Sequence, residues 1–359
     1  MKAAIISLGS KSSKWTFKAM QKYFDHVDDI NIKDIEINLE PKESVVLVKG
    51  KPIEEYDCIF AKGSFRYNSL LRALTTLLHK KSYMPVRTSA FVTAQHKLLT
   101  QLKMDLENIP MPKTYLSSST QAARNILEKI NYPVIMKFPE GTHGKGVMFA
   151  DSFASANSIL DALTALRQPF LIQEYIDTGG VDIRAFVVGN KVVAAMKRKS
   201  AEGEKRSNVH AGGKGEAVVL DEKTKKIAVN TAKVIGAEIC GIDLIEGSKG
   251  PLVLEVNLSP GLQGITAATK VDIADKIAKY LYDKTVERSK VENANGTKKI
   301  LEDVGIEPSK QKDLITTVDF RGERMLLPEL ITKITEFDEK TDVEIKIEKD
   351  KLVIKKFKM

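Results

Sequence analysis

Short apolar runs, separated by polar and glycine-rich turns, occupy the first 90 residues of the chain. The runs KAAIISL (2–8), SVVLVKG (44–50) and YDCIFAKG (56–63) predict strands. In SLLRALTTLLHKK (69–81) leucine recurs at helical spacing, which predicts an amphipathic helix. The mixture indicates a small α/β domain.

Beyond residue 90 the pattern changes to longer helices that alternate with pairs of strands. DIRAFVVG (182–189) and NKVVAAMKRK (190–199) are β-rich runs that meet at Gly189 and Asn190, a pair typical of hairpins. Strands are also predicted for PVIMKF (133–138), VMFA (147–150), FLIQEYI (170–176), AEICGIDLIEG (237–247) and PLVLEVN (251–257). Helices are predicted for AFVTAQHKLLTQLK (90–103), STQAARNILEKI (119–130), SANSILDALTALR (155–167) and DEKTKKIAVNTAKVIG (221–236).

The C-terminal quarter has a different composition. Residues 286–311 are polar and turn-forming, which predicts a linker around one short helix. Residues 312–359 combine a strand, a helix and a charged hairpin, so a small compact domain is expected there.

Length and composition set the outer limits. A chain of 359 residues with 43% hydrophobic residues predicts two or three domains. No apolar run is long enough to span a membrane, and the N-terminus lacks the features of a secretion signal, so the cytoplasm is expected. Cys58 and Cys240 stand in apolar surroundings and are expected to be buried free thiols. The net charge of +9 suits an anionic partner without choosing its class.

The segment EGTHGKGV (140–147) joins two strand-like runs and carries Gly141, Gly144 and Gly146. Glycines let backbone N–H groups approach a bound anion closely. The spacing is not that of a Walker loop, and a plain turn is the alternative interpretation. Lys137, in the preceding apolar run, needs an opposite charge if it is buried. Together the two features favour a nucleotide phosphate.

Carboxylate and amide side chains interrupt two apolar runs later in the chain. Glu255 and Asn257 stand two positions apart in LVLEVN (252–257), so they share one face of a strand. Asp243 is expected to add a third oxygen from the neighbouring strand. Oxygen donors of this kind suit Mg²⁺, which bridges carboxylates to phosphates. A polar edge strand with a capping aspartate is the alternative.

The segment KRKSAEGEKRSNVHAGG (197–213) is basic, punctuated by glycine and too polar for a core element. A surface loop is one interpretation. In the other, Arg206 neutralises charge on a transferring phosphoryl group, and the loop closes to exclude water.

Motifs across the middle of the chain resemble those of ATP-grasp carboxylate-amine ligases, in particular the RimK-type glutamate ligases. They are QEYI (173–176), DIRAFVVG (182–189), RSNVHAGG (206–213), GIDLI (241–245) and LEVNLSPGLQGI (254–265). The resemblance covers residues 57–283 and implies an ATP-grasp fold of α/β and α+β parts. An N-terminal α/β domain (1–90) would precede two α+β halves (91–285) that hold ATP between antiparallel sheets.

The resemblance also implies which residues bind ATP. Lys97 and Lys137 resemble the two lysines that hold its phosphates, and the glycines at 141, 144 and 146 belong to the phosphate loop. Glu174, Tyr175 and Ile176 match the hinge against adenine, with Asp182 near the ribose. One local departure is His96, which stands before Lys97 where the family commonly has aspartate.

Catalytic and metal-binding residues follow from the same resemblance. Arg206 and Asn208, with Ser207 between them, match the residues that face the γ-phosphate. Asp243, Glu255 and Asn257 match the ligands of Mg²⁺ or Mn²⁺.

The implied activity is a two-step ligation. ATP phosphorylates a substrate carboxylate, and an amine then attacks the acyl phosphate and expels phosphate. RSNVHAGG resembles the glutamate-adding branch, so L-glutamate is the expected amine donor, and the acceptor is a protein C-terminus or a coenzyme tail. In KGSFRYN (62–68), Lys62, Arg66 and Tyr67 offer a clamp for the acceptor carboxylate, with a surface turn as the alternative.

The tail resembles the AbrB-type swapped-hairpin domain, whose members dimerise and often bind DNA. Its basic residues alternate with acids, so a homo-oligomer or acceptor docking is favoured over DNA binding. A nucleotide-sensing DNA-binding regulator that uses the grasp fold as a switch is the rival function. The full set of Lys137, Arg206, Asp243, Glu255 and Asn257 argues against it.

Overall fold

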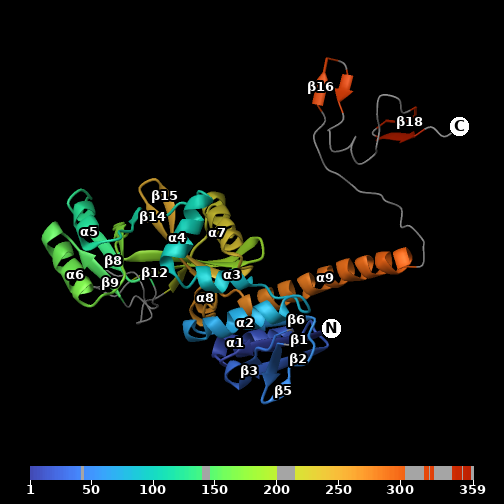
Figure 1. The fold of residues 1–359 in the computed structure, drawn as a ribbon, viewed down its shortest axis with the longest axis horizontal. Coiled ribbons are helices and arrows are strands. Elements are labelled where there is room, and N and C mark those ends of the chain that lie inside the picture. Colours follow the sequence, from blue (N-terminus) through green and yellow to red (C-terminus); the bar gives the residue numbers. More distant parts are fainter. Residues whose placement is uncertain are drawn as a thin grey trace. The chain divides into compact units, whose positions relative to one another are not determined.

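The computed structural model describes residues 1–41, 44–139, 146–199, 215–303, 319–322, 324–326, 342–349 and 351–356. These residues belong to two compact units, Met1–Asn293 and Ala294–Met359. Figure 1 draws the helices and strands of both units.

A three-stranded parallel sheet forms the centre of the N-terminal domain. Strand β1 (Lys2–Ser7) pairs with β2 (His26–Asn31) on one side and with β6 (Cys58–Ala61) on the other. Alternate residues of β1 face opposite layers, because successive side chains of a strand point to opposite faces. Ile5 packs in the cluster that contains Met20 of helix α1 (Lys11–Met20), whereas Ile6 packs with Leu74 of α2 (Asn68–Leu78).

A small antiparallel sheet completes this domain. It consists of β3 (Ile35–Asn38), β4 (Val45–Val48) and β5 (Lys51–Pro52). Single 3₁₀ turns precede β3 and α2, at η1 (Ile32–Asp34) and η2 (Phe65–Tyr67). The α/β domain predicted from the apolar runs is therefore present.

Two antiparallel sheets form the rest of the first unit (Figure 1). The four-stranded sheet has the order β7-β10-β8-β9, and the five-stranded sheet the order β13-β12-β11-β14-β15. Their strands are β7 (Thr114–Tyr115), β8 (Val134–Lys137), β9 (Val147–Ala150), β10 (Leu171–Glu174), β11 (Val181–Val188), β12 (Lys191–Lys199), β13 (Gly215–Ala217), β14 (Ile239–Gly247) and β15 (Gly250–Asn257). The hairpin predicted at Gly189 and Asn190 is confirmed by the antiparallel pairing of β11 with β12.

Helices pack against both sheets and join them to the N-terminal domain. They are α3 (Thr88–Thr93), α4 (Lys97–Leu106), α5 (Thr120–Leu127), α6 (Phe153–Ala165), α7 (Glu222–Ile235), α8 (Gln263–Thr269) and α9 (Ile273–Asp303). Helix α7 shows how the sequence sets these bounds. The Asp221 carboxylate caps its N-terminus by accepting from Thr224 N, and Gly236 ends it in the left-handed conformation.

One face of the five-stranded sheet is charged at one end of β11 and apolar at the other. Residues 186 and 188 of β11 are apolar and pack with α8 and α9, whereas Asp182 and Arg184 occupy the same face nearer the start of the strand. Helix α7 covers the opposite face with Ile227, Ala228 and other apolar residues. The charged end of this face is therefore left for a site, and the apolar end serves as core.

Helix α9 corrects one prediction. Residues 286–303, expected to be a linker with one short helix, continue the helix that begins at Ile273. The stretch ERSKVENANGTKK is rich in glutamate, lysine and arginine, which are good helix formers, so polarity alone did not indicate a break. The remainder of the expected linker, 304–311, lies outside the described residues.

The second unit contains two short hairpins among its described residues. Strand β16 (Asp319–Arg321) pairs with β17 (Arg324–Leu326), and β18 (Val343–Glu348) pairs with β19 (Lys351–Lys356). The second pair is the charged hairpin predicted from the sequence. The helix expected between them falls outside the described residues.

Both cysteines are free and buried, as expected. Burial raises the pKa of the Cys58 and Cys240 thiols to about 12, so neither thiol has thiolate character at neutral pH. Among the described helices, none has the length and apolar content needed to cross a membrane.

We expect Gly189→Ala to lower the free energy of unfolding by about 2–4 kcal/mol. Gly189 has a φ of +63°, and an added Cβ would lie 2.4 Å from Cε2 of Tyr280, whose hydroxyl is held by Glu238. The control is Gly50→Ala, where φ is +75° but no atom lies within 4 Å, so about 1–2 kcal/mol is expected. Urea unfolding followed by circular dichroism measures both; equal losses would show that the Tyr280 contact contributes nothing.

Candidate active site

Two cavities meet in the first unit. The first, of about 120 Å³, has walls from the four-stranded and five-stranded sheets and is called here the inter-sheet cavity. Its lining includes Lys97, Ile135, Lys137, Gln173, Glu174, Tyr175, Ile176, Asp182, Asp243, Leu254 and Glu255. The second, the N-terminal cavity, has about 360 Å³ and is lined by residues that include Ser10, Ser12, Ser13, Lys62, Lys97, Arg184, Arg198, Glu255, Asn257 and Ser259. Lys97 and Glu255 line both cavities.

The four residues predicted to contact adenine and ribose all line the inter-sheet cavity. At the end of β10, Oε1 of Glu174 accepts a hydrogen bond of 2.7 Å from the backbone N–H of Lys113. The Tyr175 ring meets Phe149 edge to face, with centroids 5.1 Å apart. With apolar Ile135 and Leu254 in the same wall, this end of the cavity suits a flat, partly apolar ring.

Lys137 lies at the end of β8 and points into the inter-sheet cavity, because it alternates with the core residues Val134 and Met136. It is 7% exposed, and Nζ donates to Oε1 of Gln173 at 2.8 Å. Among the described residues no carboxylate forms an ion pair with it. Burial, reinforced by the charge of Lys97, lowers the pKa of Lys137 to about 8. The charge of Glu255 opposes this shift, and a bound anion would supply a further opposite charge.

Lys97 begins helix α4, and His96 caps that helix with Nδ1, which accepts from the backbone N–H of Leu99 at 3.4 Å. An imidazole nitrogen thus performs the capping that an aspartate commonly performs at this position. The departure from the family pattern leaves Lys97 in the wall of both cavities.

Of the predicted glycine loop, only Gly146 falls within the described residues. Its φ is +75°, and an added Cβ would lie 2.2 Å from Cδ2 of Phe138, so the position requires glycine. Its carbonyl accepts from Phe138 N at 3.1 Å, which closes the hairpin of β8 and β9. Gly141 and Gly144 lie outside the described residues, as do Arg206, Ser207 and Asn208.

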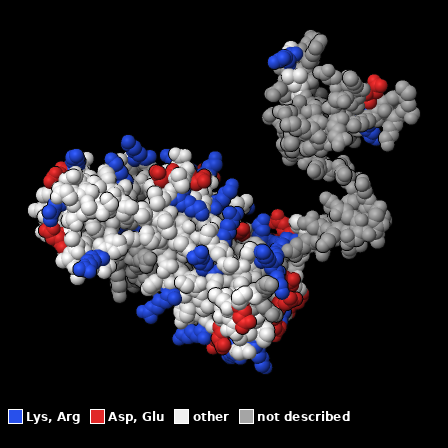
Figure 2. All heavy atoms as spheres, in the orientation of Figure 1, with Lys and Arg blue, Asp and Glu red and all other residues white. Residues whose placement is uncertain are grey.

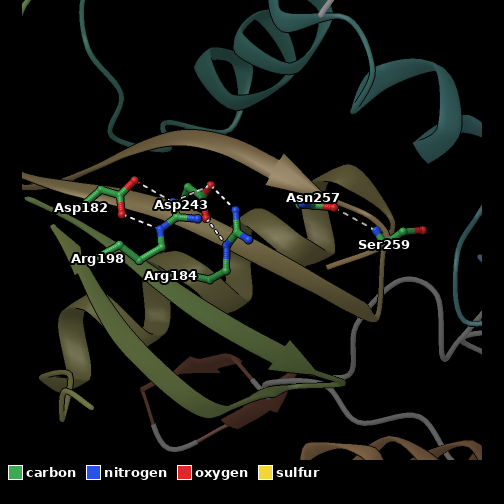
Figure 3. A network of polar contacts seen from close by, with 6 residues as sticks. All are labelled: Asp182, Arg184, Arg198, Asp243, Asn257 and Ser259. Atoms are coloured by element: carbon green, nitrogen blue, oxygen red, sulfur yellow. Dashed lines mark hydrogen bonds and ion pairs between the residues drawn. The ribbon is translucent and has the colours of Figure 1, made fainter. Parts of the chain in front are cut away.

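The three predicted metal ligands occupy neighbouring strands. Asp243 of β14 lies directly opposite Glu255 of β15, and Asn257 lies opposite Gly241. Glu255 and Asn257 line the N-terminal cavity together, as expected for positions i and i+2 of a strand. Oδ1 of Asn257 accepts from the backbone N–H of Ser259 at 3.0 Å, which fixes the amide (Figure 3).

Arg184 and Arg198 join the acids in a buried network that the sequence analysis missed (Figure 3). Arg184 grips Asp243 with two hydrogen bonds, Nε to Oδ1 at 2.7 Å and Nη2 to Oδ2 at 2.6 Å. Arg198 holds Asp182 in the same way, with both bonds 2.6 Å long, and its Nη2 also lies 2.9 Å from Oδ2 of Asp243. The two guanidinium groups line the N-terminal cavity, while their carboxylate partners line the inter-sheet cavity.

The pKa values of the two predicted acidic ligands, Asp243 and Glu255, shift in opposite directions. Burial favours the neutral form of Asp243, but Arg184 and then Arg198 outweigh it and hold the pKa of Asp243 below its ordinary value. Burial and the nearby charge of Asp243 raise the pKa of Glu255, although Lys97 opposes them. Glu255 has no hydrogen-bond donor or ion-pair partner among the described residues.

These oxygens fit a divalent cation. No three His, Cys, Asp or Glu side chains cluster in the described part of the chain, and the amide of Asn257 offers an oxygen beside the two acids. Glu255 offers both oxygens, Asn257 keeps a lone pair on Oδ1, and Oδ1 of Asp243 accepts only one hydrogen bond. A cation at this point would return Glu255 to its charged form.

A signal for Arg184 was present in the sequence. It stands between Ile183 and Ala185 in an apolar strand run, the pattern that drew attention to Lys137, whereas Arg198 stands between two lysines. Residues 197–199 were assigned both to the β-rich run 190–199 and to the polar segment 197–213, and they form the end of strand β12. Because Arg198 lies between two lysines, local composition did not indicate that its side chain is buried.

The chain is similar in sequence and in fold to known ligases. Residues 91–281 match the family described as the RimK-like ATP-grasp domain. A protein of Picosynechococcus sp. named probable alpha-L-glutamate ligase is 36% identical over 289 residues, which cover 78% of this chain and 95% of that protein. One from Halorhodospira halophila with the same name is 34% identical over 306 residues, which cover 83% of this chain and 99% of that protein.

A solved structure of similar fold is that of the ATP-grasp ligase PsnB, complexed with a phosphomimetic variant of its minimal precursor, Mg and ADP. The TM-score is 0.63 at 17% sequence identity, over 79% of this chain and 98% of that one. The chain belongs to the RimK-like ATP-grasp family of ligases.

Proposed function

We propose that the protein is an ATP-dependent ligase that joins L-glutamate to a carboxylate acceptor through an acyl phosphate. The observation that carries the proposal is the shared wall of the two cavities, where Lys97 and Glu255 line both. A nucleotide in the inter-sheet cavity with its ring at Tyr175 and its phosphates at Lys137 would extend its tail toward this wall. A carboxylate in the N-terminal cavity then lies within reach of the terminal phosphate.

Charge neutralisation is the chemical task of this wall. A carboxylate and a triphosphate repel each other, so phosphoryl transfer requires cations placed where negative charge develops. Lys97 and Lys137 supply positive charge on the nucleotide side, and Arg184 and Arg198 supply it on the acceptor side. Phosphorylation converts the acceptor oxygen into a good leaving group, which the glutamate amine displaces.

Asp243, Glu255 and Asn257 would hold Mg²⁺, which neutralises phosphate charge when bound. The related structure of PsnB contains Mg and ADP, which supports this choice for the fold. Mn²⁺ stays an alternative prediction. Arg206, Ser207 and Asn208 keep their proposed place at the γ-phosphate, in a segment outside the described residues.

L-Glutamate is proposed as the amine donor because homologues that match over most of this chain are named probable alpha-L-glutamate ligases. A peptide or protein acceptor is supported by PsnB, which was solved with a precursor peptide. A coenzyme tail is the other prediction. Oligomerisation through an AbrB-like tail also stays a prediction.

The rival function, a nucleotide-sensing DNA-binding regulator, is not favoured. Its switch would need a nucleotide site but no second cavity lined by arginines beside it. On the face drawn in Figure 2, the described Lys and Arg side chains are interspersed with Asp and Glu and form no single stripe.

The proposed function is tested by incubating the full chain with ATP, Mg²⁺, isotope-labelled L-glutamate and a cell extract. We expect ADP release and a mass increase of one or more glutamyl groups on a protein or a small molecule. ADP release that does not depend on glutamate, or label that stays in free glutamate, would refute the ligase.

We expect Lys137→Met to weaken ADP binding by about tenfold or more, because a charge-assisted hydrogen bond to phosphate contributes about 1.5–3 kcal/mol. Isothermal titration calorimetry measures the affinity. Lys129→Met removes an exposed lysine from the same domain and serves as the control. Equal affinity in the two variants would show that Lys137 does not contact the nucleotide.

A further inference from the structure

Lys62 is a buried lysine that the ligation chemistry above does not use. It directly follows β6, lines the N-terminal cavity and is 7% exposed. Among the described residues, its ammonium group has no carboxylate partner and no hydrogen-bond acceptor. Nζ lies over the Phe60 ring, 5.9 Å from its centroid.

Burial of an unpaired ammonium group costs free energy, and the cost appears as a lowered pKa of Lys62. Loss of water lowers the pKa of Lys62 to about 8, and no acid in the described part of the chain opposes the shift. Methionine at this position would fill similar space without the cost. A buried, uncompensated cation in a cavity wall indicates that an anion supplies the missing charge during function.

The first turn of helix α1 faces the same cavity. Ser10 caps this ten-residue helix by accepting from Ser13 N, and Ser10, Ser12 and Ser13 all line the cavity. The backbone N–H of Ser12 meets no acceptor among the described residues. Helix N-termini carry partial positive charge and bind carboxylates. Because β1 and β6 are parallel neighbours, this turn and Lys62 lie at the same carboxyl edge of the sheet.

The position of Lys62 is tied to the reaction centre. Gly63 N donates to Oγ of Ser259 at 3.1 Å, and Ser259 N donates to Oδ1 of Asn257 at 3.0 Å. The other charged groups of this cavity are Lys97, Arg184, Arg198 and Glu255. Both arginines are already paired with buried acids, so Lys62 adds positive charge at a second point of the same cavity.

We propose that Lys62 and the first turn of α1 form a carboxylate subsite, which binds a substrate side-chain carboxylate that ATP does not activate. The proposal rests on the proposed function and specifies its substrate class: an acidic amino acid or an acidic peptide end. Two sources share this chemistry, the incoming L-glutamate and an acceptor that itself ends in glutamate. Arg66, suggested with Lys62 from the sequence, is exposed and absent from the cavity lining.

The experiment measures binding to the full chain without turnover. Saturation-transfer NMR in the presence of ADP and Mg²⁺ compares two ligand pairs: L-glutamate with L-glutamine, and the dipeptide Glu-Glu with Gln-Gln. Wild type should prefer the acidic member of at least one pair by about tenfold. Lys62→Met should abolish that preference, and Lys62→Arg should retain most of it. Arg66→Met is the matched control on the same loop and should behave as wild type.

Preference in the first pair assigns the carboxylate to glutamate, and preference in the second assigns it to the acceptor. Lack of preference in both pairs, or a preference that survives Lys62→Met, would overturn the subsite even if the protein proves to be a ligase. Failure of ligation with a preference that depends on Lys62 would instead refute only the proposed reaction. Thermal unfolding shows whether the variant is folded. The melting temperature of Lys62→Met should equal or exceed that of wild type, because a buried unpaired charge is removed.

Discussion

Glu255→Gln will reduce glutamate-dependent ADP release by about 10³-fold, the rate effect of about 4 kcal/mol of lost transition-state stabilisation. Glu255 belongs to both cavities and lies opposite Asp243, so it stands where nucleotide, cation and acceptor are proposed to meet. Glutamine has nearly the same shape but cannot supply a negative charge to a cation. The effect should therefore appear in kcat, and ADP affinity measured without Mg²⁺ should change little.

The substitution should leave the fold intact. Burial and the charge of Asp243 already disfavour the ionised form of Glu255, so a neutral side chain relieves that cost. Glu246→Gln, at an exposed position on β14, is the matched control and should retain full turnover. Turnover of Glu255→Gln within tenfold of wild type, with normal thermal unfolding, would remove the cation site from the mechanism.

Arg198→Met will lower the free energy of unfolding by about 3–5 kcal/mol. The Asp182 carboxylate is 1% exposed and receives two hydrogen bonds from Arg198, so the substitution leaves a buried acid without its main partner. Asp243, at 2% exposed, loses one of its contacts but keeps Arg184. Urea unfolding at neutral pH measures the loss.

A double variant distinguishes the contribution of the ion pair to stability from the contribution of side-chain packing. In the double variant Asp182→Leu and Arg198→Met, no unpaired carboxylate remains at position 182, and most of the lost stability should return. Lys199→Met changes the adjacent exposed residue of β12 and should cost less than about 0.5 kcal/mol. A double variant as unstable as Arg198→Met would show that the arginine stabilises by packing and not by pairing.

Local patterns in the sequence were sufficient to predict most strands and helices of the first unit. The alternation of residues in β14 and β15 predicted that Asp243, Glu255 and Asn257 would converge, and the strand register confirms that Asp243 and Glu255 are opposite. The hairpin at Gly189 and Asn190 followed from turn chemistry. In both cases the signal is set by neighbours within a few residues, where the period of a strand controls which way side chains point.

Long-range partners were harder to predict. Whether Arg198 lies at the surface or in a core depends on Asp182 and Asp243, and the second of these is 45 positions further along the chain. Lys62 could be named as a carboxylate ligand, but its burial and the partnership with α1 depend on the parallel pairing of β1 and β6. The length of α9 was missed because charged residues serve both helices and linkers, and composition does not separate the two.

Hydrogen bonds of Ser12 and Gly63 tie the N-terminal domain to the segment that follows β15. Ser12 Oγ donates to Oε1 of Gln263 at 2.6 Å and accepts from Leu262 N at 2.9 Å, and Gly63 N donates to Ser259. Residues separated by 196 to 251 positions are thus joined directly. A chimaera that exchanges only the first 90 residues would pair Ser12 and Gly63 of one protein with residues 257–263 of another. An exchange of the N-terminal domain should therefore include residues 257–263 of the same protein.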